Sequence, residues 1–548
     1  MAILHKFKVT EEEYFDYALN YFNNNKLFDS LEMVGRCLDI DPEDFDFGML
    51  RARILYEMEL FEDALKQYYN LYLRYTAIPE LYLGLTQIFG ALGNPQKALH
   101  FLERLLEMEL DEEEAECLDM FREFDIKKFE QINSASKLRL YKFGKEEYDK
   151  AQEYIRIAKY DDADKHLENI TEQSEYYPKA LIDRAIICMG SGKHDKALIF
   201  VNKALIKDPC NIHFLLTKCM CYYLTGNQSG FESIVKIIEN LEITSPEQLN
   251  IIVSFGMEMN NHAWVAKYAE AILELRPYHR VTIQYLMQAY YNLKDYDSAK
   301  KMLAYLLKID HNDYVIKYYS LVVGDRKKET LEYTQSLQTE DVMTAVNVIV
   351  PNLIKAENFE KELNNSGGEI FLEWYFSQGY AKNRIKIVER LEIEFANFMR
   401  MQLLTDNLTF RDKLAVLRRL LSLEKPRRRD YAVSICDVIC EFDPRPPRYI
   451  EQNLSLLRLY LDLYSALSLF NDINDTKFNR FFKLISVSQS FKLPTKLQTP
   501  AFMAAFYYKY LSVEDDVTFE ETCKLFDTTP AKVLKQLENL EKIGPFRY

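Results

Sequence analysis

The sequence predicts an all-α protein built from successive helix pairs, and three observations lead to this fold class. Small residues return at an interval of 34, as between Ala64 and Ala98 and between Ala163 and Ala197. Glycine and proline, which favour turns, number only 16 each among 548 residues. Long stretches with apolar residues at helical spacing fill much of the remainder. Few turns and a regular interval together are typical of helical repeats.

The repeating unit can be placed residue by residue. If each recurring small residue takes position 20, the units begin at Glu11, Phe45, Pro79, Gly144, Pro178, Ile212, Pro246, Arg280 and Tyr314. Position 8 is then small in most units, as Ala18, Ala52, Thr86, Ala151, Ala185 and Cys219. Proline at position 32 of three units ends the second helix because it cannot donate the next hydrogen bond. We expect positions 8 and 20 to lie where paired helices cross, since a larger side chain there would hold the helices apart.

This alternation of small and bulky residues resembles the tetratricopeptide repeat (TPR) over about residues 11–112 and 144–338. The tryptophan that opens the family pattern is replaced by Tyr14, Tyr82, Leu181 or Leu215, so we expect altered packing there. The alternative is a generic helical bundle with accidental alanines. It is disfavoured because one offset is kept through six consecutive starts. The resemblance implies a TPR-type α-solenoid, a superhelix of helix pairs whose first helices line a concave groove.

The same register divides the chain into expected parts. Residues 1–112 hold three repeats, residues 113–143 form a non-repeat helical insert, and residues 144–338 hold five to six further repeats. A connecting helix and linker occupy residues 339–368, where the only Gly-Gly pair stands. Residues 369–548 carry long apolar-periodic stretches, which predict a C-terminal all-helical domain.

Charge and cysteine usage exclude some classes of function. A net charge of −15 argues against a protein whose main task is coating nucleic acid or anionic lipid, because both need a basic surface. Nine cysteines without regular spacing indicate reduced thiols in the cytoplasm. The opening "MAILHKFKVTEEEYF" lacks the apolar run of a signal peptide, and nowhere do 18 apolar residues run together. We therefore expect a cytoplasmic protein without a membrane partner.

The end of the chain carries a more specific pattern. Thr518 followed by Glu521 predicts a capping box, and a second helix is expected to turn Val533, Leu534 and Leu537 inward. This segment resembles a DNA-reading helix-turn-helix, which implies possible nucleic-acid contacts by four residues on the outward face: Lys532, Lys535, Gln536 and Asn539. Residues before it also give a local resemblance to a cyclin-box fold. The competing interpretation is a helical hairpin that only stabilises the domain, since Glu538 and Glu541 on the same helix would repel phosphate.

No catalytic or phosphate-binding motif is present in the sequence, which predicts a protein that is not an enzyme and has no cofactor. The best metal candidate is formed by Cys210, His213, Cys219 and Cys221. Because Cys219 falls on the small position 8, core packing explains it better than a metal site. Cys436 and Cys440 share one face if "SICDVICEF" is helical, and we interpret them as core residues too. The run "RRLLSLEKPRRRDY" suits contact with nucleic acid or an acidic partner, or else a solvated loop; its basic residues are Arg418, Arg419, Lys425, Arg427, Arg428 and Arg429.

A groove on the first helices of the repeats is the predicted binding site. Positions 2, 5, 9 and 12 should face it, which selects Phe15, Leu19, Phe22, Met49, Arg53, Tyr56, Gln87, Tyr148, Gln152, Ile186, Met189, Met220, Tyr223, Gln288 and Tyr291. Family members that clamp a terminal carboxylate use Lys, Asn and Arg here, whereas the first unit has Phe15 and Leu19. The lining instead favours an extended or helical apolar segment of another protein.

Two hypotheses follow for the function. The first is a non-enzymatic scaffold or adaptor that captures a protein or peptide in the groove, with the C-terminal domain holding a second partner or another copy. The second is a transcriptional regulator whose C-terminal helix-turn-helix contacts DNA while the repeats sense a peptide. Salt-dependent DNA binding would separate the two hypotheses.

Overall fold

The computed structural model describes most of the chain as helices. The described residues are 10–543, except 76–77, 107, 109–144, 173, 380, 424–430, 436–437, 443–453, 469–474, 489–490, 496–497, 512–516 and 527. The expected helical insert at 113–143 therefore lies outside the described residues. The chain forms two compact units. Unit 1 comprises Met1–Leu110, Leu307–Ser320 and Ser336–Tyr548, and unit 2 comprises Asp111–Leu306 and Leu321–Gln335.

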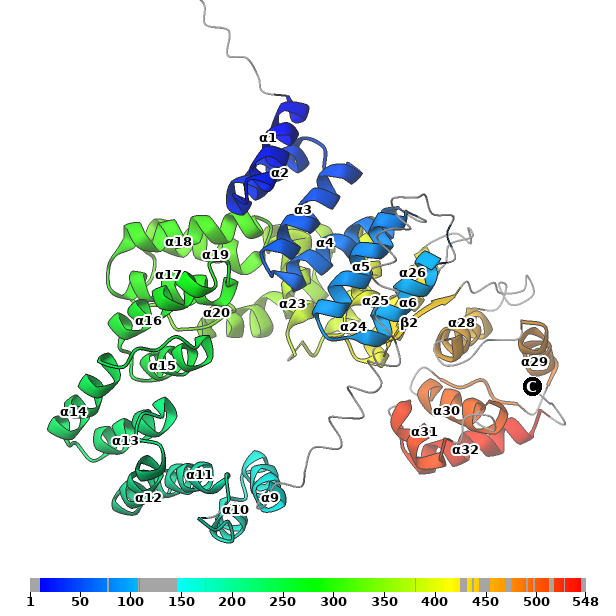
Figure 1. Ribbon diagram of the computed structural model, residues 1–548. Coiled ribbons are helices and arrows are strands. Elements are labelled where there is room, and N and C mark those ends of the chain that lie inside the picture. Colours follow the sequence, from blue (N-terminus) through cyan, green and yellow to red (C-terminus); the bar gives the residue numbers. More distant parts are fainter. Residues whose placement is uncertain are drawn as a thin grey trace, which may run out of the picture. The chain divides into compact units, whose positions relative to one another are not determined.

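The first repeat block lies in unit 1 and consists of three helix pairs (Figure 1). They are α1 (Glu11–Asn23) with α2 (Leu27–Ile40), α3 (Phe45–Glu57) with α4 (Phe61–Arg74), and α5 (Pro79–Ala91) with α6 (Pro95–Leu106). The first helix of each pair begins at its predicted residue. Thr10 caps α1 through a reciprocal capping box with Glu13, which satisfies two otherwise free backbone N–H groups.

The second block has the same 34-residue spacing. Its pairs are α9 (Lys145–Arg156) with α10 (Tyr160–Glu168), α11 (Tyr177–Gly190) with α12 (His194–Lys207), α13 (Ile212–Leu224) with α14 (Gln228–Glu239), α15 (Pro246–Glu258) with α16 (His262–Leu275), and α17 (Arg280–Asn292) with α18 (Tyr296–Ile309). Helix α19 (Tyr314–Asp325) follows them. Observed and predicted starts agree to within one residue. No sheet occurs among the described residues between 11 and 338, so the predicted all-α repeat architecture is confirmed.

The recurring small residues lie where paired helices meet. Ala64 and Ala197 at position 20 are completely buried, as are Ala52 and Ala185 at position 8. In the first pair, the hydroxyl of Ser30 at position 20 donates a hydrogen bond of 2.7 Å to the carbonyl of Ala18 at position 8. The two positions thus touch directly, which explains why the sequence keeps both of them small.

The turn inside each pair uses one left-handed residue at position 15. Eight units have a positive φ there, at Asn25, Glu59, Gly93, Ala158, Gly192, Gly226, Asn260 and Lys294. A left-handed backbone reverses the chain tightly after the first helix, and glycine adopts it without steric cost. Only three of the eight residues are glycine, so the sequence pattern alone did not reveal this rule.

Beyond the repeats, unit 1 continues with shorter helices. They are α20 (Thr339–Thr344), the π-helical turn η1 (Ala345–Ile349), α21 (Val350–Lys355), α22 (Phe359–Asn365), α23 (Gly368–Ser377), α24 (Arg384–Val388), the 3-10 turn η2 (Ile393–Phe395), α25 (Ala396–Leu404) and α26 (Phe410–Leu423). The π-helical turn directly precedes α21, whose second residue, Pro351, has no N–H to donate. Phe371 and Trp374 on α23 pack against Tyr314 of α19.

One expectation for this region is wrong. The segment that contains Cys440 is not helical, because β1 (Tyr431–Ile435) and β2 (Val438–Phe442) form an antiparallel two-stranded hairpin. Cys440 pairs with Val433 across the hairpin, while Cys436 lies outside the described residues. Short runs of valine and isoleucine suit a strand as well as a buried helix, and here β-branched residues favour the strand.

The C-terminal helices are α28 (Leu454–Ser468), α29 (Asp475–Val487), α30 (Thr499–Tyr510), α31 (Phe519–Leu525) and α32 (Pro530–Glu541). Their core is aromatic, and Phe478, Phe481 and Phe506 are completely buried in it. The capping box predicted at Thr518 and Glu521 is present at the start of α31. Among the described helices of both units, none is long and apolar enough to span a bilayer.

Candidate functional site

The groove-facing positions of α17 in unit 2 hold a segment of the chain itself. Residues 327–335, which we call the internal segment, contain no helix or strand. The segment runs antiparallel to α17, because the carbonyl of Lys328 accepts from the Tyr291 hydroxyl near the end of the helix. Six residues later, the carbonyl of Thr334 accepts from Gln288 (2.7 Å) and Gln284 (2.9 Å), closer to the start. The predicted groove residues Gln288 and Tyr291 are therefore buried beneath it.

Asn292 binds both main-chain groups of one residue of the internal segment. Its Nδ2 donates to the carbonyl of Leu331 at 2.8 Å, and its Oδ1 accepts from the N–H of the same residue at 2.6 Å. Lys294, just after the helix, donates to the carbonyl of Glu329. These side chains bind main-chain atoms, which every amino acid offers except for the N–H that proline lacks. The side chains of α17 and Lys294 therefore bind the backbone of the internal segment.

Two side chains of the internal segment are held as well. Leu331 is only 3% exposed, and Tyr333 packs against the hydrophobic core of unit 2. The Tyr333 hydroxyl lies 2.8 Å from Nδ1 of His262, the first residue of α16. Burial, together with the charge of Lys294, lowers the pKa of His262. The neutral imidazole can therefore accept the hydrogen bond from the phenol, whose own pKa is raised by burial.

The remaining predicted groove residues of unit 2 stand on α9, α11 and α13 and are more open. Ile186 is 45% exposed and Tyr223 57% exposed, and Tyr148, Met189 and Met220 are half-buried. Large apolar side chains with this much exposure on successive helices form a surface that can be buried further.

A polar cluster lies at the first of these helices. Gln152 donates to Asp183 at 2.7 Å, and Tyr148 is also hydrogen-bonded to this carboxyl group. Burial raises the pKa of Asp183 despite these two donors, and burial lowers the pKa of His213 nearby. The hydrogen bonds to Asp183 hold Tyr148 and Gln152, two of the predicted groove residues, in place.

The predicted groove residues of unit 1 are spread over α1, α3 and α5. Phe15 packs on Phe47 with ring centroids 5.0 Å apart, and Tyr56 packs on Phe61 at 5.5 Å. Leu19 and Arg53 are exposed, and three more are half-buried: Phe22, Met49 and Gln87. These residues lie on the first helices, as predicted, and aromatic contacts inside the block hold part of the set.

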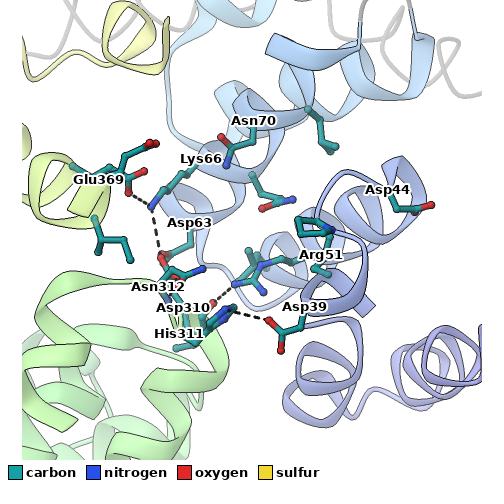
Figure 2. Close-up of a pocket in the computed structure, with 18 of the residues that line it drawn as sticks. Asp39, Asp44, Arg51, Asp63, Lys66, Asn70, Asp310, His311, Asn312 and Glu369 are labelled. Carbon is teal, nitrogen blue, oxygen red and sulfur yellow. Dashed lines mark hydrogen bonds and ion pairs between the residues drawn. The ribbon is translucent and has the colours of Figure 1, made fainter. Parts of the chain in front are cut away.

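Unit 1 also contains a pocket that the sequence did not predict. It has a volume of 520 Å³ and is lined by α2, α3, α4, residues 309–312 and α23. Figure 2 shows Lys66 of α4 between acidic groups from two distant parts of the chain. Its ammonium lies 2.7 Å from Glu373 and 3.7 Å from Asp310. Although burial opposes it, the negative charge of Asp310 and Glu373 raises the pKa of Lys66.

The cationic groups of this pocket are already engaged. Arg51 donates to the carbonyl of Ile309 at 2.8 Å, and Arg74 donates to the carbonyl of Pro42 at 3.1 Å. Arg51 and Lys66 thereby join segments 258 and 307 residues apart in the chain, whereas Arg74 contacts a residue 32 positions away. We interpret the pocket as a structural contact, in which ion pairs and hydrogen bonds hold α23 and residues 309–312 against the first repeat block.

Two of the four residues expected to contact nucleic acid do not face outward. Gln536 and Asn539 on α32 are buried, and Asn539 is hydrogen-bonded to both backbone groups of Lys492 (2.8 and 3.3 Å). The expectation of an outward face is wrong for these two, because their amides satisfy buried polar groups. Lys532 and Lys535 are exposed. Leu534, expected to turn inward, is 52% exposed.

The basic run is partly described by the structure. Arg418 is paired with the buried Asp462 of α28, and Arg419 donates to the carbonyl of Leu391 at 2.7 Å. These two residues thus join elements within unit 1. Lys425 and Arg427–Arg429 lie outside the described residues.

Two of the three cysteines of the metal candidate lie in different hydrophobic cores, and the third, Cys210, is exposed. Cys219 and Cys221 are completely buried and belong to separate hydrophobic clusters of unit 2. Burial raises the pKa of Cys219 to about 12 and that of Cys221 to about 11, which disfavours the thiolate that a metal needs. Among the residues that the structure describes, no group of three or more suitable side chains could hold a metal ion.

Comparison with known proteins supports the repeat assignment. Residues 148–211 match the family model of the tetratricopeptide repeat. This stretch is a tetratricopeptide repeat region. It covers α9 to α12, so the expected TPR resemblance is confirmed by both the family match and the helix pairs. No curated protein matches the chain significantly.

Solved structures of repeat proteins are similar to the chain at low identity. One is the TPR2AB domain of yeast Sti1 in complex with pHSP90, 15% identical, which covers 48% of this chain and 96% of its own with a TM-score of 0.21. Another is yeast Tom70, 11% identical, which covers 87% of this chain and 96% of its own with a TM-score of 0.24. Likenesses at this level carry no conclusion about binding.

The sequence did not point to Gln284, Asn292, His262 or Tyr333 as functional residues. Gln284 stands at groove-facing position 5, so the register contained a signal for it. Asn292 stands at position 13, one residue beyond the predicted positions. Tyr333 lies outside the regular part of the repeats, and only the folded structure brings it to His262.

Proposed function

We propose that this protein is a non-enzymatic interaction protein whose second repeat block binds a non-helical segment of another protein. The open site comprises the groove-facing residues of α9, α11 and α13, with Tyr148, Ile186 and Tyr223 as its main apolar contacts. One observation carries the proposal. The corresponding face of α17 already binds the backbone of an irregular segment, the chain's own residues 327–335.

The chemistry of the open site supports this function. Ile186 and Tyr223 expose apolar surface on adjacent helix pairs, and burying such surface contributes about 25 cal/mol per Å². Gln152 and Asp183 supply polar groups beside it, as the glutamines of α17 do beside the internal segment. An apolar strip with fixed polar groups is suited to a peptide, since the polar groups orient the backbone and the apolar groups add affinity.

We do not extend the proposal to DNA binding. On α32 the exposed cations are Lys532 and Lys535, and Glu538 and Glu541 are exposed on the same helix. Mixed charge of this kind gives little net attraction for phosphate.

Site-specific cross-linking tests the proposal. A photoreactive phenylalanine analogue at position 186 or 223 should cross-link to a defined segment of a partner, and mass spectrometry should identify that segment. The matched control places the same analogue at position 206 on α12, where Ile206 is 77% exposed and outside the groove-facing positions. Equal cross-linking at 206, or none at 186 and 223, would show that the groove is not the binding surface.

A variant separates binding from folding in the same experiment. Tyr223→Ala removes a side chain that is more than half exposed, so its cost should be well below the ~3 to 5 kcal/mol of a buried aromatic truncation. An aromatic residue at the centre of an interface can nevertheless contribute roughly 2 kcal/mol to a complex, about thirtyfold in affinity. We expect near-normal melting with loss of the cross-link made from position 186.

A further inference from the structure

We propose that residues 327–335 are an exchangeable internal ligand, and that α17 with His262 is a second binding site for non-helical segments of other proteins that carry leucine two residues before tyrosine. The inference deepens the proposed function by naming what this part of the groove recognises. It adds a site that is closed while the chain's own segment occupies it.

The internal segment is held mainly through its backbone. Four carbonyl groups, those of Lys328, Glu329, Leu331 and Thr334, accept hydrogen bonds from side chains of α17 or from Lys294. The N–H of Leu331 donates in return to Asn292. These hydrogen bonds require backbone groups at the right positions, and they do not require that the backbone be covalently linked to the repeats. A separate chain on the same path can therefore make all of them.

Two side chains of the internal segment are anchored in unit 2. Leu331 is almost completely buried, and Tyr333 meets both the core of unit 2 and the imidazole of His262. Between them, Glu332 is exposed. The ring of Tyr333 also contacts Tyr285 edge to face, with centroids 6.5 Å apart. A ligand therefore needs an aliphatic residue and a tyrosine at this spacing, with one residue between them.

No regular secondary structure fixes the internal segment in place. Residues 327–335 are all described and form no helix or strand, and the N–H of Lys327 donates to the carbonyl of Val322 in α19. A tethered ligand competes at an effective concentration of roughly millimolar. An external segment must therefore be abundant, or bind the open site on α9 to α13 at the same time, to displace it.

A released variant tests the inference directly. Leu331→Ser combined with Tyr333→Ser in the full chain removes both anchors, and Glu332→Ser is the matched control because its side chain is exposed. The probe is a fluorescein-labelled peptide with the sequence of residues 327–335, KKETLEYTQ, and the readout is fluorescence anisotropy. We expect the released variant to bind the probe at least tenfold more tightly than the intact chain or the control. Adding Asn292→Ala should abolish this binding.

A released variant that melts cooperatively but does not bind the probe would overturn the inference. Probe binding that is unchanged after Asn292→Ala is added would overturn it too. A probe with serine in place of its leucine and tyrosine must also fail to bind the released variant. No external partner is used, so failure here leaves the cross-linking test at positions 186 and 223 unaffected.

A second measurement applies if the released variant does not fold. Amide hydrogen exchange of the intact chain is followed with and without the unlabelled peptide at about 10 mM, above the effective concentration of the tethered segment. An exchangeable segment should show faster exchange in residues 327–335 when the peptide is present. Unchanged exchange would identify the segment as a fixed connection of the fold and overturn the inference.

Discussion

Asn292 and Leu331 are joined by a reciprocal pair of hydrogen bonds, 2.8 Å to the carbonyl and 2.6 Å from the N–H of Leu331. One amide side chain thereby satisfies both main-chain groups of a residue 39 positions away. Both residues are buried, so neither backbone group can turn to water if the amide is lost.

Removing this amide should therefore be costly. We expect Asn292→Ala to lower the free energy of unfolding by about 1 to 3 kcal/mol, because buried backbone groups are left without their partner. Chemical denaturation measures the loss. The control is Gln335→Ala, which removes a longer bond of 3.2 Å from an exposed side chain to Tyr285. An equal loss of unfolding free energy in the two variants would mean that the two hydrogen bonds of Asn292 stabilise unit 2 no more than an exposed hydrogen bond does.

The packed crossings of the repeats predict a second effect. Ala64→Asp and Ala197→Asp should each cost several kcal/mol, since both positions are completely buried against the partner helix and an unpaired carboxylate is expensive there. Ile206→Asp on the same helix as Ala197 is the control and should change the melting temperature little, because the side chain is exposed. Near-normal melting of the two alanine variants would contradict the observed packing.

The left-handed turns predict a stabilising substitution. Ala158 has a φ of 56°, a conformation that costs an ordinary L-residue about 1 to 2 kcal/mol. Ala158→Gly should raise the free energy of unfolding by up to about 1 kcal/mol, after the entropy that glycine adds to the unfolded chain is subtracted. Ala271→Gly, inside α16, should instead lower it by about 1 kcal/mol. Destabilisation by both substitutions would argue against a strained turn at Ala158.

The contact between His262 and Tyr333 predicts a pH dependence of stability. The folded pKa of His262 is lowered below its usual 6.5, so the unfolded chain binds a proton more readily. The contribution of this residue is therefore fully present above about pH 6.5 and is lost as the pH falls through the lowered folded pKa. His213 and His279 share this direction because burial lowers their pKa values too.

A single variant isolates the contribution of His262. His262→Asn keeps an acceptor near the Tyr333 hydroxyl but does not titrate. We expect the free energy of unfolding of the wild-type chain to fall more steeply than that of His262→Asn as the pH is lowered below about 6.5. Guanidinium denaturation at a series of pH values measures both curves. Parallel curves would show that protonation of His262 does not oppose folding.

The sequence by itself determined the repeat architecture of this protein. The 34-residue interval, the small residues at positions 8 and 20 and the capping box at Thr518 are local signals, because they act within one helix pair or one helix end. The helix starts could be placed to within one residue for this reason, from Glu11 to Tyr314. The same register also led to the predicted groove residues, two of which, Gln288 and Tyr291, contact the internal segment.

Other features were decided only by tertiary structure. The strand around Cys440 replaced an expected helix because a short run of β-branched residues suits either element until it finds a partner strand. Asn539 faces inward because its side-chain amide donates a hydrogen bond to the backbone carbonyl of Lys492. The internal segment took its place on α17 through contacts such as the one between His262 and Tyr333, 71 residues apart. Such contacts depend on which polar groups are buried side by side in the folded protein. A periodic pattern in a single sequence does not reveal these long-range pairs.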